Sequence, residues 1–377
     1  MFPLETGIAA IGWKHIVMIL SGIVLLYLAI EREMEPYELL PISLGIILTN
    51  LPLAGIMPST FEIFEGLPFE DLGLMGPVWK FGVASWAILP PLLFLGLGAM
   101  TDFNALLSRP KTFILGAAAQ VGIFISFLGA LALGFPIPEA ASIGIIGSAD
   151  GPTTIYTASQ LAPQLIGITA VAAYSYMAMV AIIQPPIIKA LTTEEERKIR
   201  MESTRKVSDT EKLLFPLVSM IFIILIVPRA GPLIGMFMVG NLFRESGVVD
   251  RLSDTAGGDL MNIATIFLMF SVGASMSAGV ILRVETIGIL LLGLVAFAAG
   301  TAFGTLFGKL MNYFTEEKIN PMIGAAGVSA VPMAARNVQN LGREADQHNN
   351  LLMHAMGPNL AGVVGSATVA GILLGMI

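Results

Sequence analysis

A single carboxylate stands in the least polar part of this chain. Between Ala140 and Ile188 the only Asp, Glu, Lys, Arg or His is Asp150, which lies within GSADGPTTIY (147–156). A carboxylate at membrane depth costs about 2.5–3.5 kcal/mol even on lenient insertion scales, so such a group usually faces a cavity or an ion. Asp150 is therefore the first candidate for a functional site.

The composition assigns the chain to a membrane. Of its 377 residues 55% are hydrophobic and only 12% are charged, and the mean hydropathy is +0.82. Soluble domains carry about 25% charged residues. Apolar windows near the length of a spanning helix recur throughout, and no alternating barrel pattern is present. We expect an all-α polytopic membrane protein with about 10 or 11 membrane elements.

The two halves of the chain carry related interrupted segments. IGIIGSADGPTTIY (143–156) and IGAAGVSAVPMAAR (323–336) share an Ile-Gly-x-x-Gly-x-x-x-x-Pro frame without a gap. Upstream of each, FLGLGAM (94–100) and MFSVGASM (269–276) carry a late Gly-Ala in an apolar run. Matched interrupted segments are typical of transporters built from inverted-topology repeats with broken helices. We expect that architecture here, with a mobile core and a scaffold of the elevator type.

The breaks themselves suggest an ion site. Gly and Pro in a spanning helix release backbone N–H and C=O groups that lipid cannot satisfy, so the break must be buried in protein or line a watery cavity. Half-helix ends then present oriented amides and carbonyls to an ion. Arg336 is the only charged residue between Lys318 and Arg343, and it stands where the first frame has Tyr156. The first break thus carries an anion, Asp150, and the second a cation, Arg336.

Two interpretations of this charge pair stay open. Asp150 and Arg336 could form a structural ion pair that holds the halves together. Alternatively, Asp150 and nearby hydroxyls and amides supply hard oxygen ligands for Na⁺, and Arg336 holds an anionic substrate group, because its planar guanidinium matches a carboxylate. The further oxygen ligands considered are those of Ser148, Thr153, Thr154, Asn320 and Ser329.

A charged segment divides the chain. Residues 189–212 hold seven Lys/Arg and six Asp/Glu, which predicts a solvated connection on the cytoplasmic side. The expected organisation is N-terminal scaffold helices (1–76), a first repeat (77–190), the charged cytoplasmic linker (191–212), connecting scaffold helices (213–257) and a second repeat (258–377).

Several classes of protein are excluded by what the sequence lacks. It contains no Cys, hence no disulfide, thiolate nucleophile or Cys-based metal centre. The three His residues are too scattered for a zinc motif, and no His stands in a frame that would make Ser329 a hydrolase nucleophile. The net charge of −7 is spread over short loops, so nucleic acid is not an expected partner. The N-terminus lacks the pattern of a removable signal peptide.

Four long motifs make the chain resemble a known family. They are GSADGPTTIY (147–156), GNLFRESGVVDRLSDTA (240–256), NPMIGAAGVSAVPMAAR (320–336) and HAMGPNLAGVVGSA (354–367). Together they resemble the membrane beta subunit of the biotin-dependent, sodium-pumping decarboxylases. That group comprises the oxaloacetate, methylmalonyl-CoA, glutaconyl-CoA and malonate decarboxylase complexes, and the resemblance spans essentially the whole chain.

The resemblance implies an activity that composition alone does not. In the family, a carboxyltransferase alpha subunit moves a carboxyl group to biotin on a separate carrier protein. The beta subunit then decarboxylates the carboxybiotin, consumes a proton and exports Na⁺. A small membrane subunit of gamma or delta type is a further expected partner, and a homotrimer an expected assembly. The implied location is the cytoplasmic membrane of a bacterium or archaeon, in contact with lipid.

The functional residues of the family match this chain position by position. The resemblance gives catalytic roles to Asp150, Tyr176 and Arg336, with Tyr176 in proton delivery or Na⁺ binding; packing is the alternative for this tyrosine. Arg336 and Ser329 are expected to contact carboxybiotin. The Na⁺ ligands expected from the resemblance and from the nearby hydroxyls are Asp150, Asn320, Gly324, Ser329, Ser148 and Thr153.

Two other classes of function remain compatible with the repeat and with Asp150. One is a Na⁺-coupled secondary transporter, such as a Na⁺/H⁺ antiporter or a Na⁺/carboxylate carrier, without decarboxylase activity. The other is a structural membrane anchor for a soluble complex. An anchor has no need of an intramembrane Asp and Arg, so it is the weaker of the two.

Overall fold

The computed structural model describes residues 6–58, 71–202, 205–278, 284–315 and 317–377. Within these ranges the chain is helical and has no strand, which confirms the expected all-α polytopic membrane protein. Six helices are long and apolar enough to cross a membrane there, or seven if one bent pair counts as a single span. The other apolar windows of the sequence fall in shorter or interrupted helices. The spans are Trp13–Glu31, Pro110–Ala132, Pro163–Leu191, Asp250–Ala274, Glu285–Met311 and Leu352–Met376, with Val78–Ala84 plus Leu89–Met100 as the bent pair.

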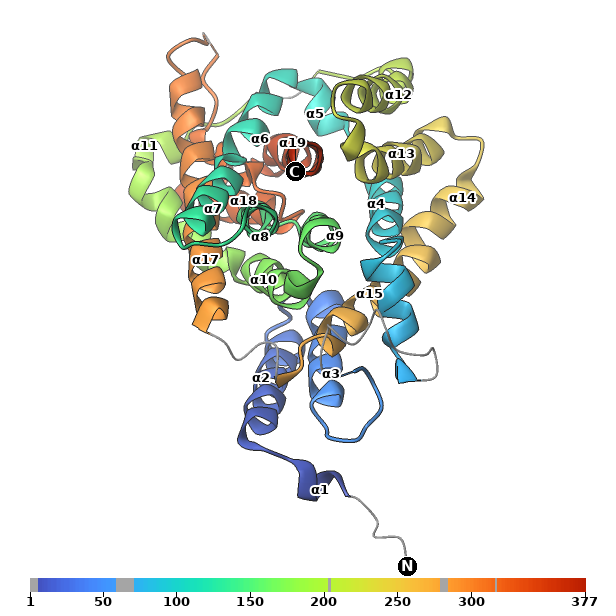
Figure 1. Ribbon diagram of the computed structural model, residues 1–377. Coiled ribbons are helices and arrows are strands. Elements are labelled where there is room, and N and C mark those ends of the chain that lie inside the picture. The colour runs from blue at the N-terminus through green and yellow to red at the C-terminus, as the bar shows by residue number, and fades with distance from the viewer. Residues whose placement is uncertain (1–5, 59–70, 203–204, 279–283, 316) are drawn as a thin grey trace, which may run out of the picture.

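Figure 1 shows the arrangement of the elements. Up to the charged linker they are α1 (Gly7–Ala10), α2 (Trp13–Glu31), α3 (Pro36–Thr49), η3 (Val78–Ala84), α4 (Leu89–Met100), α5 (Asn104–Ser108), η4 (Pro110–Thr112), α6 (Phe113–Ala119), α7 (Val121–Ala132), α8 (Ile137–Ile145), η5 (Ile146–Ser148), α9 (Gly151–Leu161), η6 (Pro163–Leu165) and α10 (Ile166–Leu191). From the linker onward they are α11 (Glu194–Arg197), α12 (Asp209–Ile226), η7 (Pro228–Ala230), η8 (Gly231–Gly235), α13 (Met236–Ser246), α14 (Asp250–Thr255), η9 (Ala256–Leu260), α15 (Met261–Ala274), α17 (Val284–Met311), η10 (Pro321–Gly327), α18 (Met333–Ala345) and α19 (Leu352–Met376).

The packing divides the helices into two sets that meet along one boundary (Figure 1). In the first set, α3 packs on α2 and α15, and α4 packs on α13 and α15. In the second set, α17 packs on α7, α10 and η10, and α19 packs on α6 and η10. The second set contains both interrupted frames. Helices α4 and α15, which the sequence assigned to the two repeats, pack in the first set. The inverted relation of the halves and the domain boundaries stay predictions.

Both predicted breaks interrupt a helix. The first frame runs through the end of α8, the short turn η5 and the start of α9, and the second runs from η10 through an extended stretch into α18. Each break lies against a neighbouring helix at a pair of glycines. A side chain at Gly147 would overlap the backbone of Gly122 on α7, and one at Gly324 would overlap the backbone of Gly304 on α17. Glycine is required at these positions because two backbones approach each other directly.

The charged linker is fastened to the second half of the chain. The Arg200 guanidinium pairs with Asp346, with a nitrogen–oxygen distance of 2.5 Å, and Lys189 pairs with Glu344 at 2.7 Å. At the start of α12, the hydrogen-bonded Arg205 guanidinium lowers the pKa of Glu211 to about 2. These groups are exposed, so each pair stabilises the fold only slightly. Together they hold the linker against α18 and the loop that follows it.

Candidate functional site

Asp150 caps the second half of the first broken helix. The chain leaves η5 through Ala149 in the left-handed conformation (φ 53°) and re-enters a helix at Gly151. The Asp150 carboxylate accepts a hydrogen bond from the backbone N–H of Thr153, with 3.1 Å between nitrogen and oxygen. Asp is a favoured residue at this position, because its side chain satisfies a free N–H and faces the positive end of the helix dipole. The break therefore places an anion, with only 5% of its surface exposed, at a helix N-terminus.

The second oxygen of Asp150 contacts Ser366 on α19. The Ser366 hydroxyl lies 2.6 Å from Asp150 Oδ2 and 2.9 Å from the carbonyl oxygen of Val363. A hydroxyl has one proton, so Ser366 can donate either to an ionised Asp150 or to Val363. In the second case its lone pairs can accept a proton from a neutral Asp150. This arrangement serves both protonation states of the carboxyl group without moving the backbone.

The two broken helices meet through their backbones. The N–H of Ser329, in the second break, donates to the carbonyl oxygen of Ser148, in the first, at 2.9 Å. Residues that are 181 positions apart in the sequence are thus hydrogen-bonded at the centre of the second set. Asp150 lies two residues beyond that junction. The structure therefore brings Asp150, Ser148 and Ser329 together.

A small cavity lies beside the junction, where the two helix sets meet. Its volume is about 120 Å³, which is room for several water molecules. The second set contributes Asp150, Tyr174 and Ser329 to its wall, and the first set contributes Glu38 and Thr265. The rest of the wall is apolar and is formed chiefly by Leu93, Phe94, Leu97, Met177, Met261, Met269, Val331 and Val363.

Three hydroxyl groups near Asp150 are buried without a hydrogen-bond partner among the described residues. They belong to Thr153, Tyr174 and Ser329. The Thr153 hydroxyl faces the Asp150 carboxylate without completing a hydrogen bond to it. An unsatisfied buried polar group costs about 1–3 kcal/mol, so three of them around one carboxylate need a common explanation. A cation bound by their oxygen atoms supplies one, because hydroxyl and carboxylate oxygens are hard ligands.

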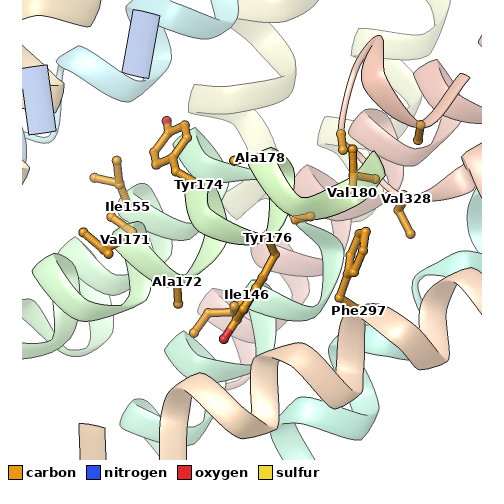
Figure 2. Close-up of a cluster of buried hydrophobic side chains, with 14 of the residues drawn as sticks. Ile146, Ile155, Val171, Ala172, Tyr174, Tyr176, Ala178, Val180, Phe297 and Val328 are labelled. Carbon is orange, nitrogen blue, oxygen red and sulfur yellow. The ribbon is translucent and has the colours of Figure 1, made fainter. Parts of the chain in front are cut away.

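Two tyrosines on α10 point in opposite directions (Figure 2). The Tyr176 hydroxyl donates to the backbone carbonyl of Leu290 on α17. The Tyr174 ring instead packs directly on Gly151, next to Asp150, where no side chain larger than hydrogen would fit. The structure thus places Tyr174 at the cavity and Tyr176 on the far face of α10. The role predicted for Tyr176 stays a prediction.

Asn320 and Gly324 lie on the η10 side of the second break: Asn320 caps the start of η10, and Gly324 lies within it. The Asn320 amide donates to the carbonyl oxygens of Arg197 and Ile199 in the linker, at 3.0 and 2.9 Å. Gly324 packs on Gly304. These contacts hold η10 to the linker and to α17, and neither residue lines the cavity around Asp150. The Ser148 hydroxyl donates to the carbonyl oxygen of Ile145, so its backbone carbonyl, not its side chain, lies at the junction.

Arg336 projects from the first turn of α18 and is exposed. The described residues contain no ion pair between Arg336 and Asp150; the Asp150 carboxylate instead accepts hydrogen bonds from the Ser366 hydroxyl and the backbone N–H of Thr153. This geometry argues against a structural ion pair between the halves. Glu35, before α3, is a described acidic group on which the charge of Arg336 acts. Among the described residues no ion pair or hydrogen bond occupies the guanidinium, so an anionic group from outside could bind there.

Sequence reasoning missed Ser366, Tyr174 and Glu38. Ser366 lies in the fourth motif, but a neutral serine among small residues carries no signal of its own. Tyr174 stands two residues from Tyr176 on one helix, and only the helical rotation separates their faces. Glu38 stands at the beginning of an apolar run, where a charge is usually solvated. Each of these three residues reaches the site only through tertiary packing.

Comparisons with known proteins match nearly the whole chain. The model of the family described as "Na+-transporting oxaloacetate decarboxylase beta subunit" matches residues 14–377. The methylmalonyl-CoA decarboxylase subunit beta of Propionigenium modestum is 56% identical, over 99% of this chain and 97% of the relative. The glutaconyl-CoA decarboxylase subunit beta of Acidaminococcus fermentans is 54% identical, over 99% and 96%. The oxaloacetate decarboxylase beta chain of Haemophilus ducreyi is 49% identical, over 98% and 96%.

Proposed function

Because the chain belongs to the family of Na⁺-transporting oxaloacetate decarboxylase beta subunits, we propose that it decarboxylates carboxybiotin and couples this reaction to Na⁺ export. It is a multi-pass membrane protein and a subunit of a decarboxylase. The finer assignments below are our proposals: the carboxybiotin substrate, the consumed proton and the partners. Those partners are a carboxyltransferase alpha subunit, a biotin carrier protein and a small membrane subunit of gamma or delta type, with three copies of this chain in the complex.

The observation that carries the proposal is the set of oxygen atoms around Asp150. One carboxylate at the junction of two broken helices stands beside the partnerless hydroxyls of Thr153 and Ser329. A single carboxylate cannot fill the coordination shell of Na⁺, and the neutral hydroxyls complete it without further charge. We assign Asp150, Thr153 and Ser329 as Na⁺ ligands. Asn320 and Gly324, predicted as Na⁺ ligands, would act on the site indirectly, by holding η10 against the linker and α17.

Arg336 is the proposed anchor of the carboxybiotin carboxylate. It is exposed on α18, in the same broken segment that carries Ser329. Decarboxylation breaks the bond between the ureido nitrogen and the carboxyl carbon. CO₂ leaves, and the electron pair that stays on the ring nitrogen takes up a proton. A guanidinium that binds the carboxylate in two places fixes its plane relative to the ring, and Ser329 links this end of the segment to the Na⁺ site.

Alternation of Na⁺ and a proton at Asp150 provides the coupling. Moving one Na⁺ against 100 mV costs about 2.3 kcal/mol before any concentration gradient. In our proposal, decarboxylation drives a movement of the second helix set against the first, and a proton that reaches Asp150 displaces Na⁺ to the outer side. Ser366 suits this exchange, because it can donate to the carboxylate or accept from the acid. The cavity between the sets is where such a movement would change access to the site.

The test is carboxybiotin decarboxylation by the complex reconstituted in proteoliposomes. We expect Asp150→Asn to abolish the stimulation by Na⁺, and Arg336→Ala to raise the KM for free carboxybiotin. Full Na⁺-stimulated decarboxylation by Asp150→Asn would refute the assignment. Na⁺ movement that is driven by ion gradients alone, without decarboxylation in the complete complex, would support the secondary transporter instead.

A further inference from the structure

A second carboxylate faces the cavity of Asp150 from the other helix set. Glu38 lies in the first turn of α3 and forms part of the cavity wall opposite Asp150. No described Lys, Arg or His pairs with it, and the charge that acts on it is that of another carboxylate, Glu35. A carboxylate that lines an internal cavity of a membrane protein without a described cationic partner is costly, and usually lies on the path of an ion or a proton.

The Tyr174 hydroxyl lies within the influence of both carboxylates. Its side chain is 2% exposed, its oxygen has no hydrogen-bond partner among the described residues, and it lines the same cavity. The charges of Glu38 and Asp150 both act on this hydroxyl. A buried hydroxyl between two carboxylates has an oxygen lone pair to offer to a cation that passes from one to the other. Among the three partnerless hydroxyls near Asp150, this is the one that is also under the influence of Glu38.

The acidic residues continue from Glu38 to the surface of the second set. Glu35 precedes α3, and one of its carboxylate oxygens is buried with no hydrogen-bond partner in the part of the chain that the structure describes. The charge of Arg336 reaches Glu35, and the charge of Glu35 reaches Glu38. The charges of these side chains thus influence one another in sequence, from the exposed arginine proposed to bind carboxybiotin to Glu38 at the cavity of Asp150.

The same series begins at the end of the molecule that carries the charged linker. Asn50, just after the far end of α3, donates to the carbonyl oxygen of Met276. Met276 in turn contacts Gly167, at the start of α10. The end of α3 therefore lies near the start of α10, while Glu38, at the beginning of α3, shares a cavity with Tyr174, farther along α10. The two helices thus run in opposite directions. Because α10 ends at the linker, Glu35 and Glu38 are on the linker side of Asp150.

We propose that Glu38, together with the Tyr174 hydroxyl, forms a second Na⁺ position through which the cation passes between the linker side and Asp150. The inference rests on the proposed function and extends it, since it names the residues on the access path. Glu38 belongs to the first helix set and Asp150 to the second. A cation held between them would therefore be handed over only while the two sets are in the arrangement seen here. A movement of the sets would separate the two positions.

Na⁺ binding to the purified full-length chain in detergent tests this inference. The probe is radioactive Na⁺ at constant ionic strength, with K⁺ as the replacement. We expect Glu38→Gln to weaken the apparent Na⁺ affinity about tenfold, because one of two charges that face the same cation is lost. Tyr174→Phe is expected to weaken it by about threefold, the loss of one neutral ligand. Glu31→Gln, at the exposed end of α2, is the matched control and should bind Na⁺ as the wild type does.

The outcomes separate this inference from the function on which it rests. If Glu38→Gln and Tyr174→Phe both bind Na⁺ with wild-type affinity while Asp150→Asn loses binding, the second position does not exist and the proposed function stands. If Asp150→Asn itself keeps wild-type binding, the proposed Na⁺ site is wrong. Glu38→Asp retains the charge and should stay within about threefold of the wild type. If Glu38→Gln does not fold, unchanged binding by Tyr174→Phe alone overturns the inference.

Discussion

The two broken helices share a sequence frame, but the backbone groups released at the two breaks are hydrogen-bonded in different ways. Each break releases backbone groups that lipid cannot satisfy. In the second break, neighbouring side-chain amides satisfy the freed carbonyl oxygens. Asn359 donates to Ala326 and Val328 at 2.9 and 2.8 Å, Gln184 to Ala325 at 3.0 Å, and Gln120 to Gly327 at 3.3 Å. In the first break, the carbonyl of Ser148 is satisfied by the second break itself, and an Asp takes the helix N-terminus.

The second break is held by hydrogen bonds that do not change, whereas the first carries a group that can change its protonation or its ligand. Asn359, Gln184 and Gln120 are neutral amides whose hydrogen bonds do not depend on pH or on an ion, so the second break is held in one shape. Asp150 can exchange a proton or a cation. The hydrogen bond between Ser329 and Ser148 holds the first break, which carries Asp150, against the second break. In our proposal the backbone of the second break therefore stays in place, while its side chains Ser329 and Arg336 bind ligands.

The largest effect is expected from Asp150→Asn. Loss of the carboxylate at the junction should lower Na⁺-stimulated carboxybiotin decarboxylation by about 100- to 1,000-fold, which corresponds to about 3–4 kcal/mol of activation free energy. The amide oxygen can still accept from the Thr153 N–H, and the amide nitrogen can donate to the Ser366 hydroxyl, which then donates to Val363, so thermal unfolding in detergent should change little. If Asp150→Asn decarboxylates carboxybiotin at nearly the wild-type rate, the first break has no chemical role that the second lacks.

Asn359→Leu tests the rigidity of the second break. The substitution keeps the approximate volume and leaves the carbonyls of Ala326 and Val328 unsatisfied, so we expect the free energy of unfolding to fall by about 2–3 kcal/mol. The measurement is a denaturant titration of the purified chain in detergent. Asn262→Leu, at an exposed position of α15, is the control. If the two variants are equally stable, the amides do not support the break.

Ser366→Ala tests the hydroxyl that serves both states of Asp150. We expect the apparent Na⁺ affinity to fall by about three- to tenfold, because an ionised Asp150 loses the donor to one of its oxygens. Ser366→Thr keeps the hydroxyl and should retain most of the affinity. The measurement is the Na⁺ dependence of decarboxylation. An alanine variant that behaves like the threonine variant would show that the hydroxyl has no part in the exchange.

The smallest effect is expected from Tyr176→Phe. The substitution removes the hydrogen bond to the Leu290 carbonyl and should lower the free energy of unfolding by about 1 kcal/mol. From its place on α10, we expect a smaller change in Na⁺ dependence than from Tyr174→Phe, which alters the cavity. If Tyr176→Phe changes the Na⁺ dependence more than Tyr174→Phe does, the role that the resemblance gives to Tyr176 is supported over the geometric one.

Local sequence signals were enough to locate the breaks and the charge. The scarcity of charged residues made Asp150 stand out, and the shared Gly and Pro positions predicted where α8 and η10 would end, because these residues act on the backbone nearby. The helical membrane class followed from composition. The number of helices that cross the membrane in full could not be predicted as well, because an apolar window in the sequence does not show whether its helix is straight or interrupted.

The rest of the site depends on contacts between distant segments. Nothing near Ser366 or Asn359 in the sequence indicates that one meets Asp150 and the other the second break. Tyr174 and Tyr176 differ only in the face of α10 that they occupy, and that depends on which neighbours pack there. Glu38 joins the cavity because α3 packs on α15. Such contacts are properties of the folded chain, and no local pattern predicts them.

The most direct test of the account is a high-resolution structure of the complete complex in Na⁺ and, for comparison, in K⁺. The account predicts density for a bound ion, present in Na⁺ and absent in K⁺, coordinated by a carboxylate oxygen of Asp150 and the hydroxyl oxygens of Thr153 and Ser329. A cation bound elsewhere, with Asp150 still hydrogen-bonded to Ser366 and no ion beside it, would contradict the central claim.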